Sequence, residues 1–497
     1  MGLLKKLAGE SAIYGLSSIV GRFLNYLLVP LHTHVFTNPG EYGAVTEIYA
    51  YISFLAIIFT YGMETAFFHF TRKYPERTKS VFATGMASLA VSTIVFCGSI
   101  ILFSGSFAEM LNYQEHPEYM TYMAMVIGLD TLTAVPFAKL RQEGKAKRFA
   151  FLKLFGISVN IFFNLLFFVI LPVWSRKESG LLLELSQWLY NPAVGAGYVF
   201  LANLFASAAT CLLMAGRMRF RFMDFDFQLW REQMTYAIPL LFAGLAGMIN
   251  ETLDRALIRH LITDKEEAMV QLGIYGACYK LSVIMTLFIQ AFRYSAEPFF
   301  FNQFGKEDAK ETYAKVTKYF TITCTIVFLG VMMYIDLFKY FIGEPYRVGL
   351  GVVPILLLAN MCLGIFFNLG MWYKMTGKTS FGLFFTVFGA IITIGLNILL
   401  VPAMGYMGAA WATLGCYAGM MVLSYVIGQI KYPVPYQTGR LLFYIAIALA
   451  FYALSELFKS WIDPSTALRL VFNTACFTSF LLLMGKWERP PVIQPKQ

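Results

Sequence analysis

Long apolar stretches alternate with short polar segments along the whole of this 497-residue chain. A helix of about twenty mostly apolar residues crosses the ~30 Å hydrocarbon core of a bilayer. By this criterion the pattern predicts about fourteen transmembrane helices, and the expected fold class is an all-α integral membrane protein. The expected spans are centred near residues 20, 57, 92, 128, 161, 204, 245, 285, 327, 361, 391, 419, 449 and 476.

The polar residues inside these stretches repeat with an offset of 233 positions. Tyr42-Gly43-Ala44 falls on Tyr275-Gly276-Ala277, and Glu64 falls on Glu297. The offset matches further pairs without a gap, namely Arg22 with Arg255, Gly144-Lys145 with Gly377-Lys378, and Asn164 with Asn397. A repeat that keeps costly polar groups within apolar segments indicates two lobes that face a shared polar path.

The repeat divides the chain into three expected parts. Residues 1–220 form an N-terminal six-helix lobe, residues 221–436 a C-terminal six-helix lobe, and residues 437–497 two additional helices and a cytoplasmic tail. Because each copy holds an even number of crossings, the two bundles should be a pseudo-twofold pair related by an axis along the membrane normal. Residues 174–192 are an insert in the first copy, and their apolar side chains predict a short helix that lies in the membrane interface.

Composition supports this picture and orients the chain. Hydrophobic residues make up 58% of the sequence and charged residues 14%, and the mean hydropathy is +0.62. With a cytoplasmic N-terminus, lysines and arginines concentrate about threefold in the cytoplasmic loops, as the positive-inside rule requires. Both termini are then cytoplasmic. This topology accounts for the net charge of +10, so no nucleic-acid partner is expected.

The same sequence argues against several kinds of chemical site. The seven cysteines lie within predicted spans and form no CxxC pair, so neither a disulfide framework nor a metal site is expected. Thr376-Gly377-Lys378-Thr379 resembles the end of a phosphate-binding loop, but Trp372 stands where that motif needs glycine. The same Gly-Lys pair at another helix end predicts a helix cap instead. Since the sequence shows no Ser/His/Asp arrangement, we expect a transporter without a cofactor rather than an enzyme.

Polar side chains share helix faces within several spans. In the first span, positions three or four residues apart carry Ser11, Tyr14, Ser18, Arg22 and Asn25. The eighth span carries a similar stripe that ends in Gln290, Arg293 and Glu297. A charge at the bilayer centre costs about 3 kcal/mol or more, so it normally faces an aqueous cavity or a partner. For isolated serines and threonines the alternative is packing between helices.

Arginine is suited to a phosphate ligand because its planar guanidinium donates two parallel hydrogen bonds and stays charged. Arginines in both copies of the repeat therefore predict a cationic site for an anionic head group. The candidate substrate-binding residues are Arg22, Asn25, Arg255, Gln290 and Arg293.

Acidic residues within the spans are candidates for proton coupling or for tuning the charge of the cavity. These residues are Glu64, Asp130, Glu251, Asp254 and Glu297. Two alternatives stay open. Asp130 can instead be a packing residue that is hydrogen-bonded beside Thr131 and Thr133. Glu251 and Arg255, four residues apart in the seventh span, can simply neutralise each other.

Three segments resemble the multidrug/oligosaccharidyl-lipid/polysaccharide (MOP) exporter superfamily. They are Gly21-Arg22-Phe23-Leu24-Asn25-Tyr26-Leu27-Leu28-Val29-Pro30, Glu41-Tyr42-Gly43 and Thr60-Tyr61-Gly62-Met63-Glu64. Within the superfamily the chain is most similar, over its whole length, to the polysaccharide-type (Wzx-like) flippases of bacteria. It also has some likeness to the MurJ-like lipid II flippase branch. In that branch arginines on the first helices bind pyrophosphate, and Arg22 is the position that matches best.

The resemblance implies a flippase that moves a polyprenyl-pyrophosphate-linked oligosaccharide across the bacterial inner membrane by alternating access. The two added helices would form a lateral groove for the lipid tail. Membrane lipid, and a glycan polymerase or glycosyltransferases, are the implied partners of a monomeric protein. An ion-coupled small-molecule exporter of the same fold stays as an alternative, although that branch usually has twelve spans and an acidic residue in the first. A non-transporting membrane scaffold is a third hypothesis.

Overall fold

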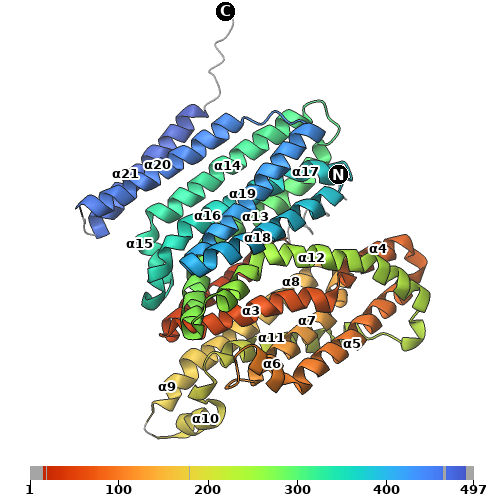
Figure 1. The fold of residues 1–497 in the computed structure, drawn as a ribbon. Helices are drawn as coiled ribbons and strands as arrows, with labels where there is room; N and C mark the ends of the chain where they lie inside the picture. The colour runs from red at the N-terminus through yellow and green to blue at the C-terminus, as the bar shows by residue number, and fades with distance from the viewer. Residues whose placement is uncertain (1–14, 18, 178, 463–465, 489–497) are drawn as a thin grey trace, which may run out of the picture. The chain divides into compact units, whose positions relative to one another are not determined.

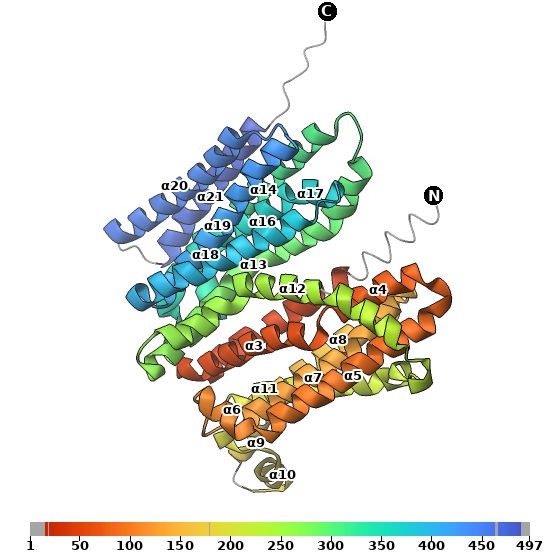
Figure 2. The ribbon, with the colours of Figure 1, turned by 45° about the vertical axis from the view of Figure 1, so that its right-hand side comes forward.

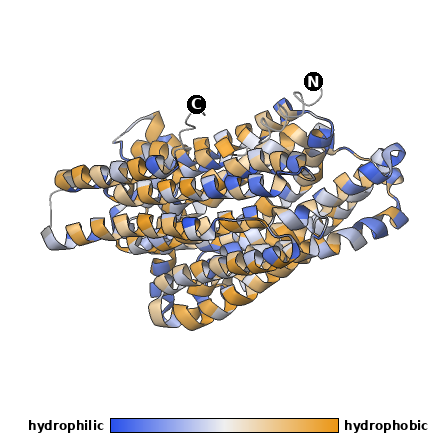
Figure 3. Cartoon of the chain, turned by 90° about the horizontal axis from the view of Figure 1, so that it is seen from above, coloured by the Kyte–Doolittle hydropathy of each residue, from blue (hydrophilic) through white to orange (hydrophobic). Residues whose placement is uncertain are grey.

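The computed structural model describes residues 15–17, 19–177, 179–462 and 466–488. All regular secondary structure in these residues is helical, and they contain no strand (Figure 1, Figure 2). They include 13 helices that are long and apolar enough to cross a membrane, and apolar residues predominate along the helices (Figure 3). The predicted all-α membrane fold is confirmed.

The expected span near residue 20 falls partly outside the described residues, because residues 1–14 and 18 are not among them. Its described part, residues 15–17 and 19–26, is helical. Three residues of the polar stripe predicted on this span lie outside the described residues, namely Ser11, Tyr14 and Ser18.

Contacts divide the chain into two compact units. Unit 1 comprises Met1–Ala277 and Thr386–Cys416, and unit 2 comprises Cys278–Phe385 and Tyr417–Gln497. Three helices contribute residues to both units, namely α13 (Lys265–Gln303), α18 (Ser380–Met404) and α19 (Tyr406–Lys431). The lobes predicted above are copies of the sequence repeat rather than contact units, so their boundaries stay a prediction.

Unit 1 is a bundle of long helices with several short helices at its ends. Its helices before α13 are α2 (Leu28–Val35), α3 (Pro39–Thr60), α4 (Met63–Lys73), α5 (Thr78–Leu102), α6 (Ser104–Met110), α7 (Glu118–Gln142), α8 (Ala146–Leu165), α9 (Leu171–Ser175), α10 (Leu181–Leu189), α11 (Gly197–Met218) and α12 (Phe227–Leu261). The short helix predicted in the insert is present as α10. Its exposed side chains include Leu181, Leu185 and Trp188, and its position in the membrane interface stays a prediction.

Helix caps explain where α3 and α12 begin. Asn38 accepts a hydrogen bond of 2.9 Å from the backbone N–H of Gly40. At the start of α12, Asp226 accepts a hydrogen bond of 2.9 Å from the backbone N–H of Leu229. The other carboxylate oxygen of Asp226 lies 2.5 Å from Nη2 of Arg77, so this cap also ties α12 to the segment before α5.

The repeated Gly-Lys pairs are helix caps, as the sequence predicts. Gly144 follows α7, and Gly377 follows α17 (Met371–Met375). Their φ angles are 67° and 73°, in the left-handed region that glycine adopts without steric cost. The two copies of the repeat therefore share a backbone conformation at this point as well as a sequence.

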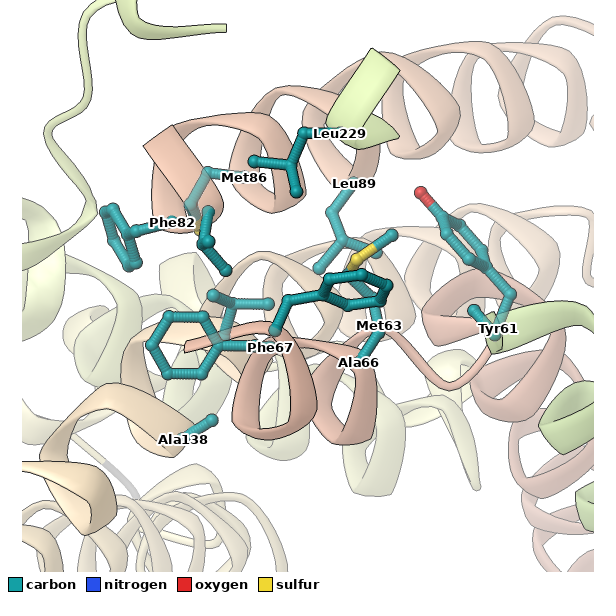
Figure 4. Close-up of a cluster of buried hydrophobic side chains, with 13 residues drawn as sticks. Tyr61, Met63, Ala66, Phe67, Phe82, Met86, Leu89, Ala138 and Leu229 are labelled. Carbon is teal, nitrogen blue, oxygen red and sulfur yellow. The ribbon is translucent and has the colours of Figure 1, made fainter. Parts of the chain in front are cut away.

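The second span of the first copy is broken between α3 and α4. Tyr61 and Gly62 have φ angles of 33° and 75° at the break. The left-handed conformation is costly for tyrosine. Its hydroxyl forms a hydrogen bond of 2.7 Å with Ser88 of α5, which helps to hold it there. Beyond the break, Met63 and Phe67 pack into a buried cluster with α5 and α12 (Figure 4).

Unit 2 contains the rest of α13 together with the C-terminal helices. These are α14 (Ala309–Met333), α15 (Ile335–Phe338), α16 (Val352–Leu369), α17, α20 (Thr438–Ile462) and α21 (Thr466–Trp487). The unit also includes the start of α18, up to Phe385, and the end of α19, from Tyr417. The two added helices, α20 and α21, pack against α14. Two ion pairs help to hold α21: Arg469 lies 2.7 Å from Asp336 of α15, and Glu488, just after α21, lies 2.5 Å from Lys318 of α14.

Candidate functional site

Repeat-equivalent glycines meet where α3 and α13 begin, within unit 1. The offset relates Gly40 to Gly273 and Gly43 to Gly276. A Cβ atom added to Gly273 would lie 1.8 Å from the carbonyl oxygen of Pro39, and one added to Gly43 would lie 2.2 Å from that of Met269. The two helices thus approach at backbone distance, as helices with small interfacial residues do in membranes. The two copies of the repeat therefore contact each other through matched faces.

A buried carboxylate lies beside this contact. Glu47 on α3 has no exposed surface and accepts hydrogen bonds from the hydroxyls of Tyr51 at 2.7 Å and Tyr113 at 2.6 Å. Nε of Arg259 on α12 lies 3.6 Å from its Oε2, and Nη1 of Arg259 donates to the carbonyl of Lys265 at 2.9 Å. A buried ion pair is costly unless hydrogen bonds satisfy its members. The two tyrosine hydroxyls satisfy Glu47, whereas Nε of Arg259 is buried without a hydrogen bond among the described residues.

Sequence reasoning missed Glu47 but not its neighbourhood. The predicted coupling residue Asp254 is buried on α12 and accepts a hydrogen bond of 2.5 Å from the hydroxyl of Tyr275. Half-buried Arg255 donates from Nη1 to the backbone carbonyl of Glu251 at 3.2 Å, and Glu251 is exposed. The signal that could have revealed Glu47 is a carboxylate in an apolar span, with a tyrosine one helical turn later.

Arg22 and Asn25 are exposed on the first helix. Arg22 forms no ion pair with another described residue. Asn25 accepts a hydrogen bond of 3.4 Å from Asn160 on α8. Asn164 donates to the carbonyl of Asn160 at 2.8 Å and pairs with Nε2 of His32 at 2.7 Å, so amide groups link Asn25 to a buried histidine.

Asp130 on α7 has polar neighbours from two other helices. Ser207 on α11 and Lys153 on α8 lie near its carboxylate. Nζ of Lys153 also lies 4.2 Å from the ring centroid of Phe137. Asp130 is therefore a member of a charged cluster, and sequence reasoning missed its cationic neighbour.

The matched carboxylates Glu64 and Glu297 each have a matched cation. Glu64 forms an ion pair with Arg141, and Glu297 lies 2.6 Å from Nζ of Lys374. Arg141 and Lys374 are related by the same offset as the two glutamates. Sequence reasoning overlooked this match. The ion pair is thus part of the repeat.

The second copy has one more cation at this pair. Nη2 of Arg293 lies 3.6 Å from Oε1 of Glu297, and its guanidinium carbon lies 4.0 Å from the ring centroid of Phe367. Gln290, a half-buried residue, precedes Arg293 by about one helical turn on α13. Of the predicted site residues, Gln290, Arg293 and Glu297 belong to unit 2, and the others belong to unit 1. Within the described residues, no group of three or more His, Cys, Asp or Glu is placed to hold a metal ion.

Comparison with known proteins gives the family. Residues 7–302 match the family model described as "Polysaccharide biosynthesis protein". The chain belongs to this family. No curated protein sequence matches it.

Two solved structures illustrate the fold. The lipid II flippase MurJ in an inward closed conformation has a TM-score of 0.69 at 13% identity, covering 95% of this chain and 98% of that one. An inward-facing multidrug resistance MATE family transporter of the MOP superfamily has a TM-score of 0.62 at 14% identity, covering 85% and 98%. At these identities the likeness shows the fold. Together with the family match, it confirms the predicted resemblance: the chain is a multi-pass membrane protein with the fold of MOP-type flippases and transporters.

Proposed function

We propose that the protein moves a polyprenyl-pyrophosphate-linked oligosaccharide across the bacterial inner membrane by alternating access. The observation that carries this proposal is a carboxylate in each copy of the repeat, Glu64 or Glu297, that lies within a long apolar span and pairs with a repeat-matched cation from another helix. Charges are retained in apolar spans when they face a polar path or a charged ligand. The family description, polysaccharide biosynthesis, supports a glycan as the cargo.

The substrate-binding residues of this proposal are Arg22, Asn25, Arg255, Gln290 and Arg293. Arg22 is exposed and Arg293 is half-exposed, so a phosphate can reach both guanidinium groups, and both keep their charge throughout the cycle. Glu64 and Glu297 tune the charge of the path. Asp130 is the proposed proton carrier, because it shares its surroundings with Lys153.

Alternating access needs an end that closes and opens. We assign the basic loops to the cytoplasm, so the contact between the beginnings of α3 and α13 lies towards the opposite face. The glycine contact and the pair of Glu47 with Arg259 close this end of unit 1. Opening lets water solvate the separated charges, which offsets the loss of the ion pair.

Substitution of Arg22 tests the proposed binding role. In vesicles that contain purified protein and a fluorescent lipid-linked sugar, Arg22→Ala should lower the rate of transfer about tenfold or more, because a charge-assisted contact is lost. Membrane insertion, measured by the yield of folded protein, should stay at the wild-type level. Arg22→Lys keeps the charge and should retain part of the rate. Full transfer by Arg22→Ala would contradict the role of this residue.

Depletion in cells tests the substrate class. Loss of the protein should cause an undecaprenyl-linked intermediate to accumulate on the cytoplasmic leaflet, and extraction with mass spectrometry identifies it. The fold of the MATE transporter favours an ion-coupled exporter of small molecules as the second candidate function. A change in drug sensitivity without accumulation of a lipid-linked precursor would support that candidate instead.

A further inference from the structure

Two cations in unit 2 converge on one oxygen of Glu297. Nζ of Lys374 lies 2.6 Å from Oε1 of Glu297, and Nη2 of Arg293 lies 3.6 Å from the same atom. The ring of Phe367, 4.0 Å from the guanidinium carbon, supports Arg293 from its face. The pocket that Arg293, Glu297 and Phe367 line with five neighbours has an internal volume of about 10 Å³, which is room for at most one water.

At the equivalent pair in the first copy, the position that matches Arg293 carries no cation. Thr60 stands at the position of Arg293, and its hydroxyl donates to the carbonyl of Ala56 at 2.7 Å. Glu64 and Arg141 therefore form a pair with balanced charge. Glu297, Lys374 and Arg293 together carry an excess positive charge. By these contacts, an anion gains more from binding at the pair in the second copy than at the pair in the first.

A carboxylate between two cations occupies the place that a phosphate oxygen would take. A pyrophosphate offers more charge and more acceptor oxygens than a carboxylate does, and Arg293 can bind it through two parallel hydrogen bonds. The side chain of Glu297 is 39% exposed, so it has room to turn away from the cations. We propose that Glu297 is a counter-ion that the pyrophosphate of the substrate displaces from Lys374 and Arg293. This inference rests on the proposed function and adds Lys374 to the binding residues.

Displacement also provides a route for release. When Glu297 returns to the two cations, it competes with the bound pyrophosphate. Glu297 thus weakens binding of the substrate and shortens its residence, as a transporter requires. Removal of its charge should therefore tighten binding and slow turnover, which is an effect that a purely structural ion pair does not have.

Binding of farnesyl pyrophosphate to the purified full-length protein in lipid nanodiscs tests this inference, with farnesol as the uncharged probe. Lys374→Ala should weaken binding of farnesyl pyrophosphate about tenfold or more, the loss of one charge-assisted contact. Glu297→Gln, which keeps the shape of the side chain, should bind it several-fold more tightly. The matched variant Arg141→Ala, at the balanced pair, should change binding less than about twofold. Lys374→Arg, which keeps the charge, should restore most of the affinity and controls for misfolding.

The outcomes separate the two proposals. If the wild-type protein does not prefer farnesyl pyrophosphate to farnesol, the proposed function itself fails. If the wild type has that preference but Glu297→Gln binds no more tightly, the displacement of Glu297 is wrong while the proposed function stands. An equal loss of affinity in Lys374→Ala and Arg141→Ala would show that neither pair is specific for the pyrophosphate.

Discussion

The two copies of the repeat build the same ion pair on different backbones. In the first copy the second span is broken at Tyr61 and Gly62, and Glu64 lies just beyond the break. In the second copy α13 continues unbroken for 39 residues, and Glu297 lies within it. Each glutamate nevertheless meets a matched cation. The pair is therefore a property of the repeated helix positions, whereas the break and the extra cation distinguish the copies.

The glycine contact and the buried carboxylate extend this comparison. Gly43 of the first copy meets Gly273 of the second, so both copies contribute a glycine to that contact. Glu47, however, corresponds by the offset to Lys280, a residue of opposite charge. The first copy alone supplies the buried carboxylate for Arg259. Both copies thus contribute glycines to the helix contact, whereas the charged residues at matched positions differ between the copies.

The largest expected effect is at Glu47. Glu47→Ala leaves Arg259 buried without its carboxylate and should lower the free energy of unfolding by about 3–5 kcal/mol. Thermal unfolding in detergent measures the loss. Glu41→Ala, at an exposed position on the same helix, should stay within about 0.5 kcal/mol of wild type. The double variant Glu47→Ala/Arg259→Met should recover part of the loss, and no recovery would contradict a direct coupling.

A comparison of Gly273 with Gly40 tests how symmetric the glycine contact is. Gly273→Ala places a methyl group 1.8 Å from a backbone carbonyl and should destabilise the protein by about 1–3 kcal/mol. At Gly40 the nearest atom to an added Cβ is Oδ1 of Asn38 at 3.2 Å, a side-chain atom that can move. Gly40→Ala should therefore cost less than half as much. Gly98→Ala, with no atom within 4 Å, is the control, and equal losses at all three positions would refute the close contact.

Exchange of Gly62 and Ser295 between the copies tests the break. Gly62→Ser puts a side chain at a left-handed position, 3.0 Å from Cβ of Leu240, and should cost about 1–2 kcal/mol. Ser295→Gly lies within the continuous helix α13 and should cost about 0.5–1 kcal/mol. Denaturant or thermal unfolding measures both losses of stability. A smaller loss for Gly62→Ser than for Ser295→Gly would mean that the break does not depend on glycine.

The smallest expected effect depends on pH and lies where the second copy begins. The backbone N–H of Leu229 and the guanidinium of Arg77 lower the pKa of Asp226 below its ordinary value. A lowered pKa in the folded state adds stability above the unfolded pKa, and this stability is lost as the pH falls through the folded pKa. At pH 7, Asp226→Ala should cost about 1 kcal/mol, while Asp226→Asn, which keeps the cap, should cost less. At low pH the difference between wild type and Asp226→Ala should shrink to the smaller difference between Asp226→Asn and Asp226→Ala, because the protonated carboxyl keeps the cap but not the charge. A constant difference would argue against the charge.

The sequence predicted the features that depend on local composition. Apolar stretches gave the long helices, since a span in lipid must satisfy its own backbone hydrogen bonds. The apolar insert gave α10, and the Gly-Lys pairs gave two helix caps with positive φ. Each of these features is set by residues close together in the chain. The family resemblance, which rests on short motifs, was confirmed as well.

The site was predicted only in part, because ion pairs join helices that are distant in the chain. Glu47 and Arg259, and Asp130 and Lys153, lie on different helices, and no spacing along one helix reveals such partners. The sequence repeat could have revealed the ion pairs of Glu64 and Glu297, because the offset that relates these two glutamates also relates Arg141 to Lys374.

By itself, the sequence determined which residues are spans, which polar groups are repeated and where the copies differ, as at Thr60 and Arg293. Tertiary structure decided which cation neutralises which carboxylate, and how far each ion pair is buried. The physical reason is that apolar burial in a bilayer is a property of each segment, whereas the cost of a buried charge depends on the partner that packing brings to it.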